Sequence, residues 1–217
     1  MKKLPKIIFL FFFLSVSAQQ NDLDFREDQF FFSFSYPFFS NNQSDLIQNK
    51  FSYSYSLGFV RDFPINIKRT IALAVGLGFE KSVVYNNYKI YEDENEFVST
   101  LIIDDYNQNF LSLSTIKIPF EFRWRSADEI NHSFWRIYSG IGLKIPTKIK
   151  ALYSANGTEE ISFLRKNSPV FDFNIAVGYN TWNIYFSTDL KSFTNKLNKN
   201  SNYDIKFTKI GLVFYVL

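Results

Sequence analysis

The segment from Lys50 to Arg61, KFSYSYSLGFVR, alternates without a break between two chemically opposite faces. The residues of one face are large and apolar or aromatic: Phe51, Tyr53, Tyr55, Leu57 and Phe59. The residues of the other face are small: Ser52, Ser54, Ser56, Gly58 and Val60. Successive side chains of a strand point to opposite faces, so this segment predicts one complete β-strand. Small residues opposite aromatic ones fit the narrow interior of a small barrel whose outer face meets lipid.

The same alternation recurs along the chain and predicts an all-β protein. The segments expected to form strands are Phe30–Phe38, Lys50–Arg61, Lys68–Glu80, Asn109–Arg125, Phe134–Thr147, Pro169–Asn180, Asn183–Ser192 and Asp204–Leu217. Bacterial outer-membrane barrels have an even number of strands, so we expect an eight-stranded antiparallel up-and-down transmembrane β-barrel. The last segment is apolar on both faces; we favour Val213, Tyr215 and Leu217 toward lipid, and the opposite phase stays open.

The bulky faces of these segments are expected to contact lipid. Their members are Phe51, Tyr53, Tyr55, Leu57, Phe59, Ile71, Leu73, Val75, Leu77, Phe79, Ile116, Ile118, Phe120, Phe122, Ile141, Leu143, Phe171, Phe173, Ile175 and Val177. Trp124, Trp135 and Trp182 lie near predicted strand ends on one side, where they would form part of an aromatic girdle. Pro119 lacks a backbone donor, so we expect a bulge or a locally broken ladder there.

The predicted connections alternate between long and short, as extracellular loops and periplasmic turns do in outer-membrane barrels. Within one long connection, Asn156-Gly157 lies between apolar pairs and predicts a hairpin that projects above the membrane. A similar pair of strands is expected on either side of residues 92–96. If either pair lay within the bilayer, the barrel would have ten strands.

The first residues, MKKLPKIIFLFFFLSVSA, combine three lysines, an apolar run and a small-residue cleavage site. We therefore expect residues 1–18 to be a cleaved secretory signal peptide and residues 19–217 to be one barrel domain. The apolar run is about half of the ~20 residues that a spanning helix needs. The formal charge of +3 equals the contribution of the leader lysines, so the remainder is balanced and predicts no nucleic-acid partner. Cysteine is absent, which excludes disulfides and thiolate chemistry.

Charged residues also occur on the inward faces of the predicted strands. They are Glu80, Lys117, Glu121, Arg123, Arg125, Arg136, Lys144, Asp172, Asp189 and Lys191. A buried charge without a partner costs several kcal/mol, so we expect these ten to form a network that plugs the lumen. The network could serve as an ion or proton path, but a structural role is favoured because eight strands leave no open channel.

Other candidate sites are weaker. His132 beside Ser133 raises the question of catalysis, but no orienting group is evident and the predicted turn is at the wrong end for known lipid-modifying barrels. The pairs Gly76-x-Gly78 and Gly140-x-Gly142 lie mid-strand, where they relieve crowding rather than bind phosphate. An acidic cluster in an outer loop could hold calcium, but its spacing matches no known calcium-binding loop. Its members are Glu92, Asp93, Glu94, Glu96, Asp104 and Asp105. We expect no catalytic residue, no cofactor and no metal.

Two stretches resemble the PorT-like outer-membrane β-barrel family of Gram-negative bacteria. They are LSLSTIKIPFEFRWR, from Leu111 to Arg125, and FDFNIAVGYN, from Phe171 to Asn180. The resemblance implies the barrel fold and an outer-membrane location. The namesake of the family assists protein secretion, and this role does not follow from the pattern.

The expected protein is thus an integral barrel of the cell outer membrane with a plugged lumen, structural or acting as a scaffold through extracellular loops. Its expected partners are outer-membrane lipids and other envelope proteins. One alternative is a lipid-modifying enzyme on the same fold that uses His132. Another is a soluble periplasmic, lipocalin-like ligand binder, which requires protein to shield Tyr53, Tyr55 and Phe59.

Overall fold

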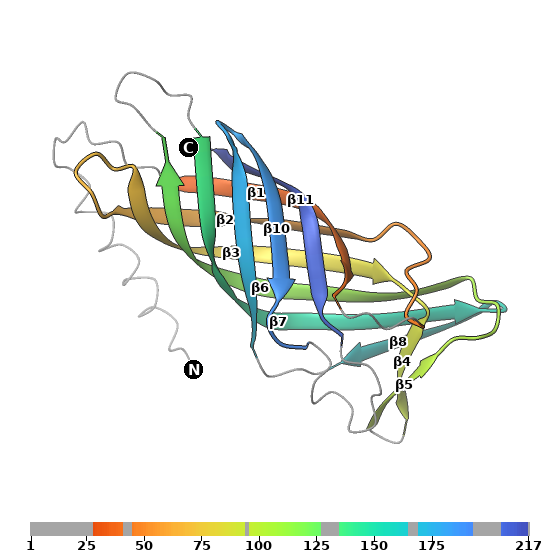
Figure 1. Cartoon of the computed structure of the whole chain (residues 1–217). Coiled ribbons are helices and arrows are strands. Elements are labelled where there is room, and N and C mark those ends of the chain that lie inside the picture. The colour runs from red at the N-terminus through yellow and green to blue at the C-terminus, as the bar shows by residue number, and fades with distance from the viewer. Residues whose placement is uncertain are drawn as a thin grey trace, which may run out of the picture.

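The computed structural model describes residues 28–40, 45–93, 96–126, 135–164, 169–192 and 205–216. These residues form eleven strands (Figure 1): β1 (Gln29–Phe39), β2 (Tyr53–Pro64), β3 (Ile71–Tyr85), β4 (Tyr88–Asp93), β5 (Glu96–Leu101), β6 (Gln108–Arg125), β7 (Trp135–Ala155), β8 (Thr158–Leu164), β9 (Val170–Tyr179), β10 (Trp182–Asp189) and β11 (Phe207–Val216). The described residues contain no helix that is long and apolar enough to cross a membrane. The expected signal peptide, residues 1–18, lies outside them.

Eight of the strands close into one antiparallel ring. The order is β6-β3-β2-β1-β11-β10-β9-β7, and β7 pairs back onto β6. The seam between β1 and β11 runs from Phe30 opposite Val216 to Phe39 opposite Phe207. This closure leaves no free edge within the ring, as a sheet in hydrocarbon requires. The predicted eight-stranded barrel is confirmed.

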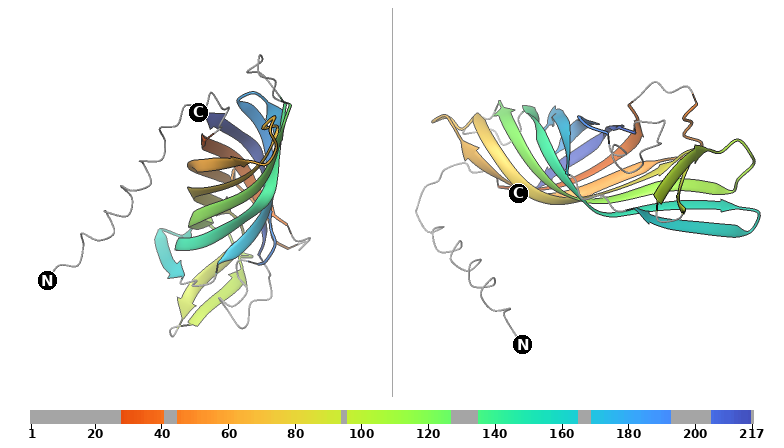
Figure 2. Two further views of the ribbon diagram at one scale, coloured as in Figure 1. Left: turned by 90° about the vertical axis from the view of Figure 1, so that its left-hand side faces the viewer. Right: turned by 90° about the horizontal axis from the view of Figure 1, so that it is seen from below.

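The remaining three strands lie beyond one end of the ring (Figures 1 and 2). β8 continues the sheet from β7, and β4 and β5 pair only with each other. β4, β5 and β8 take no part in the ring, so the ten-stranded alternative is wrong. The turn between β7 and β8 has positive φ at Asn156 (49°) and at Gly157 (78°), which is the backbone of a type I′ turn. The projecting hairpin predicted from Asn156-Gly157 is therefore confirmed.

Pro119 interrupts the ladder between β3 and β6, as the missing donor requires. Pairing runs through Val75 opposite Phe120, stops, and resumes in the same register at Gly78 opposite Lys117. The predicted broken ladder is therefore present. The sheet also contains a register shift, but this shift lies between β6 and β7, at Ser114 and Thr115. On β7, Thr147 is the extra residue between Pro146 and Lys148, and its hydroxyl donates to the carbonyl of Ser114 at 3.0 Å.

Burial follows the alternation of the sequence. On β1, Phe30 is 62% exposed and Phe31 only 9%. Apolar side chains cover the outside of the ring, and serine, alanine, glycine and charged side chains fill the inside. The aromatic rows therefore do not form a core of a water-soluble body.

The prediction of which face of the last strand points toward lipid is wrong. Val213 and Tyr215 on β11 are buried inside the barrel, whereas Ile210, Leu212 and Val216 are exposed. Both faces of β11 are apolar, so hydrophobicity alone does not distinguish them. Lys209 decides the phase, because its ammonium pairs inside the barrel with the carboxylate of Glu80. Leu217 lies outside the described residues.

Candidate functional site: the plugged interior and the projecting sheet

The residues predicted to meet lipid lie on the outer face of the ring, and each is exposed or half-buried. Phe51, Leu73, Phe120 and Phe173 are among the exposed ones. Phe59 is also exposed, and Tyr53 and Tyr55 are half-buried, so protein does not shield them as a soluble ligand-binding barrel would require. That alternative is wrong.

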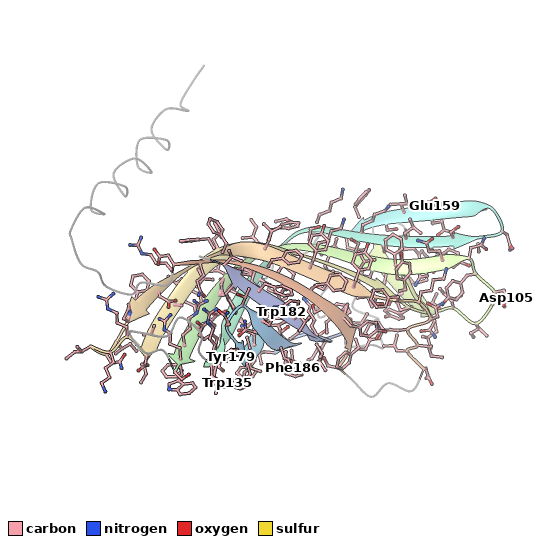
Figure 3. The ribbon with its side chains drawn as sticks, turned by 90° about the horizontal axis from the view of Figure 1, so that it is seen from above. Asp105, Trp135, Glu159, Tyr179, Trp182 and Phe186 are labelled. Atoms are coloured by element: carbon pink, nitrogen blue, oxygen red, sulfur yellow. The ribbon has the colours of Figure 1, made fainter. Side chains whose placement is uncertain are left out.

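Aromatic residues gather on the outside at the rim opposite the projecting strands. Figure 3 shows Trp135, Tyr179 and Trp182 together, away from Glu159 and Asp105. The rings of Trp135 and Tyr179 are 5.6 Å apart, and those of Trp182 and Phe214 are 4.8 Å apart. Trp135, Tyr179, Trp182 and Phe186 also line an apolar groove of about 430 Å³ on this outer surface. Aromatic rings at this level are typical of the girdle where a barrel meets the lipid headgroups.

The interior near this rim contains a cluster of ionic contacts centred on Asp62. Its Oδ1 accepts from Nη1 of Arg123 at 2.7 Å, and its Oδ2 accepts from Nη2 of Arg125 at 2.6 Å. Nε and Nη2 of Arg123 also donate to Oε2 of Glu121, at 3.0 and 2.8 Å. The side chains of Asp62, Arg123 and Arg125 are fully buried. Each charge is therefore compensated within the protein, as burial demands.

Two tyrosines complete this cluster. The guanidinium of Arg123 lies 4.4 Å from the ring centre of Tyr138 and 5.2 Å from that of Tyr215. The two rings pack edge to face with centres 5.2 Å apart. The aromatic faces thus cover the part of the cation that no carboxylate reaches.

A second group of ion pairs lies further along the lumen, toward the projecting strands. Nζ of Lys117 donates to Oδ2 of Asp172 and to the hydroxyl of Tyr185, both at 2.9 Å. Lys144 pairs with Asp189, and Lys209 pairs with Glu80. Beside these last two pairs lies a cavity of about 10 Å³, which is just large enough to admit one water molecule.

Apolar side chains fill the lumen above the ion pairs. The cluster comprises Val84, Tyr88, Ile90, Leu111, Leu113, Ile149, Ala151, Leu164, Ile205 and Phe207, with Phe39, Leu46 and Leu101 packed against it. Tyr88 and Ile90 come from β4 and Leu164 from β8, so the projecting strands contribute directly to the closure. This apolar cap and the two ionic layers occupy successive levels of the described lumen.

The projecting strands are also fixed to one another by polar contacts. Nζ of Lys89 on β4 is 2.8 Å from Oε2 of Glu160 on β8 and 4.0 Å from the ring centre of Tyr153 on β7. The amide of Asn109 on β6 donates to the carbonyls of Asn86 and Tyr88, at 2.9 and 3.0 Å. The hairpin β4–β5 is therefore bound to the sheet β6–β7–β8 at the N-terminal end of β4.

The structure brings most of the predicted inward charges into the lumen. Glu80, Lys117, Glu121, Arg123, Arg125, Arg136, Lys144, Asp172 and Asp189 are buried there. The prediction for Lys191 is wrong: Lys191 is exposed, because β10 ends at Asp189 and alternation no longer directs a residue beyond the strand.

The sequence analysis missed Asp62, Lys209 and Gln29, which are all buried partners of the network. Asp62 falls one residue past the predicted end of its strand, and Lys209 lies on the strand whose phase was open. A charge on an otherwise apolar strand is a signal for the inward face, and this signal identifies Lys209.

The remaining candidate residues form no site in the described part of the chain. His132, Ser133 and Glu94 lie outside the described residues. Asp104 and Asp105 are exposed in the connection after β5. The described residues contain no group of histidine, cysteine or acidic side chains placed to hold a metal ion.

Comparison with known proteins supports the geometry. The outer membrane protein beta-barrel domain family matches residues 17–210, which include nearly all of the ring. No curated protein and no solved structure matches the chain. A closed ring with an apolar outer face and a family match over most of the sequence give the same assignment. The chain belongs to the outer membrane protein beta-barrel domain family and is an integral protein of the outer membrane.

Proposed function

We propose that this protein is a non-enzymatic, non-conducting anchor that holds a rigid β-platform outside the cell for an envelope partner. We define the platform as β4, β5, β8 and the parts of β6 and β7 that pair beyond the ring. The observation that carries the proposal is the packing of β4 and β8 onto the lumen through the apolar cluster. A barrel that served only as a pore would gain nothing from strands that close its mouth.

The platform is suited to binding because its surface is fixed before a partner arrives. Lys89 and Asn109 fix β4 to its neighbours, and one edge of β8 pairs with β7 while no described strand covers its other edge. A preorganised surface loses less conformational entropy on binding than a flexible loop does. An uncovered strand edge also offers backbone groups to an added strand.

The orientation in this proposal follows from the connections. Short turns join β2 to β3 and β9 to β10 at the rim with the tryptophans, and the platform occupies the other rim. Outer-membrane barrels place short turns in the periplasm and long connections outside. With residues 1–18 removed as a signal peptide, the chain would begin on the periplasmic side.

We further propose an affiliation with PorT-like members of the family and an envelope or secretion role. The stretches that carry the resemblance form most of β6 and all but the first residue of β9. These strands flank β7 in the ring. The partner in this proposal is another envelope protein that contacts the platform.

Site-specific crosslinking tests the proposal. A photoreactive residue would replace Ile161 on β8 and, as the matched control, Ile184 on β10; both side chains are exposed, at 46% and 65%. We expect one reproducible protein adduct from position 161 in outer membranes and none from position 184. The absence of an adduct at 161, or the same adducts at both positions, would overturn the scaffold role. Lipid deacylation or acyl transfer that His132→Ala abolishes would overturn the non-enzymatic assignment.

A further inference from the structure

The outer face of the ring carries a cluster of lysines next to a row of exposed apolar side chains. Lys81 on β3 and Lys148 on β7 flank Ser114 on β6, because Lys81 pairs with Ser114 and Ser114 with Lys148. Lys150 lies two residues further along β7 and faces the same way. We call Lys81, Ser114, Lys148 and Lys150 the lysine patch. Strand spacing places the Cα atoms of Lys81 and Lys148 about 10 Å apart, and those of Lys148 and Lys150 about 7 Å apart.

The patch lies directly above an apolar wall. The next cross-strand row toward the tryptophan rim consists of Leu57, Phe79, Ile116 and Ile145. From Ser114 to Trp124, β6 advances about ten residues, which at about 3.4 Å per residue and a tilt near 40° spans about 26 Å. The apolar band of an outer-membrane barrel is about 25 Å tall. The patch therefore lies at the boundary between acyl chains and headgroups, in the leaflet on the platform side.

Among the described residues, no acidic side chain pairs with the positive charge at this boundary. The described parts of the chain give Lys81, Lys148 and Lys150 no ion pair, and no acidic residue occupies their two cross-strand rows. Nζ of Lys148 lies 5.0 Å from the ring centre of Phe163, and Nζ of Lys150 lies 5.7 Å from that of Phe110. Like charges on neighbouring strand positions repel one another unless an anion lies between them.

We infer that the lysine patch binds the phosphate groups of a phosphorylated glycolipid in the outer leaflet, whose acyl chains lie on the wall below. Lysine ammonium groups and the Ser114 hydroxyl suit phosphate oxygens. The adjoining apolar wall favours a lipid over a soluble anion, because one molecule then satisfies both surfaces. The inference rests on the orientation in the proposed function, which places the platform outside the cell.

Binding of bisphosphorylated lipid A to the purified, detergent-solubilised protein tests the inference. The variant Lys148→Gln/Lys150→Gln removes two charges from the patch. The control variant Lys68→Gln/Lys191→Gln removes two exposed charges elsewhere. We expect the patch variant to bind about 30-fold more weakly at low salt, since each lysine near a lipid surface contributes about one kcal/mol. We expect the control to match the unaltered protein, and dephosphorylated lipid A to bind both variants equally.

Four results would overturn the inference. Equal loss in both variants would indicate an effect of net charge alone. If the unaltered protein bound dephosphorylated lipid A as tightly as bisphosphorylated lipid A, phosphate would have no role in binding. Full competition by inorganic phosphate, or equal affinity for phosphatidylglycerol, would indicate a general anion surface. The orientation is tested separately, by labelling the variant Ile161→Cys in intact cells with a reagent that does not cross the membrane. A wrong orientation can therefore be distinguished from a failure of the lysine patch to bind phosphate.

Discussion

Asp62 accounts for the arrangement of the ionic cluster near the tryptophan rim. Its two carboxylate oxygens each accept from a different buried guanidinium, of Arg123 and of Arg125. The carboxylate of Asp62 thus pairs with two guanidinium groups, and Arg123 forms a second ion pair with the carboxylate of Glu121. Removing one member of a buried ionic group is costly because its partners stay buried without compensation.

The substitution Asp62→Asn should destabilise the folded barrel by about 3–5 kcal/mol, because an amide keeps the shape but loses the charge and turns a donor toward one guanidinium. Denaturant unfolding in detergent micelles, followed by intrinsic fluorescence, measures the change. Asp28→Asn is the control: Asp28 is 31% exposed and 3.9 Å from Arg61, so its loss should cost less than about 1 kcal/mol. Equal effects of the two substitutions would contradict the assignment of Asp62.

At the scale of elements, hydrophobic alternation predicted most of the strands, but it did not predict for every strand which face points inward. The ring strands were predictable because a lipid-facing row and a small or charged inner row differ at every second residue. β11 was not, since both its faces are apolar. Apart from the pair of Glu121 and Arg123 on β6, the ion pairs of the lumen could not be predicted in detail, because each joins strands that are not neighbours. Lys117 on β6 reaches Asp172 on β9, and Lys209 on β11 reaches Glu80 on β3 across the lumen.

The hairpin β4–β5 should loosen from the platform when Lys89 loses its charge. In Lys89→Met the aliphatic stem remains, but the ion pair with Glu160 and the contact with the Tyr153 ring are lost. We expect amide hydrogen exchange in β4 and β5 to rise by about tenfold while exchange in the ring strands stays unchanged, since local opening is governed by local contacts. Lys191→Met, at an exposed position, should change neither. Faster exchange throughout the ring would show that Lys89 stabilises the whole barrel instead.

At the scale of the whole molecule, three layers of side chains occupy the lumen: the Asp62 cluster, the three lysine–carboxylate pairs and the apolar cap. The layers use different chemistry, so a change of salt or pH that weakens the ionic layers leaves the apolar one in place. An eight-stranded ring also has an interior only wide enough for its own side chains.

The purified protein in planar bilayers should therefore show no stepwise conductance at any salt concentration tested. The double variant Lys117→Ala/Asp172→Ala should remain closed as well, because the apolar cluster lies above the lost pair. A wide-lumen porin in the same bilayers is the positive control. Reproducible single-channel steps from the unaltered protein would show that the layers open.

The seam between β1 and β11 has a consequence for how the protein reaches its membrane. It pairs the first described strand with the last, residue by residue, from Phe30 with Val216 to Phe39 with Phe207. Until β11 arrives, both edges of the sheet expose unpaired backbone that hydrocarbon does not tolerate. Partial insertion, strand by strand as the chain emerges, is therefore unavailable to a lone molecule. The nascent sheet must be assembled at the water interface or shielded by an insertion machine until its final segment is delivered.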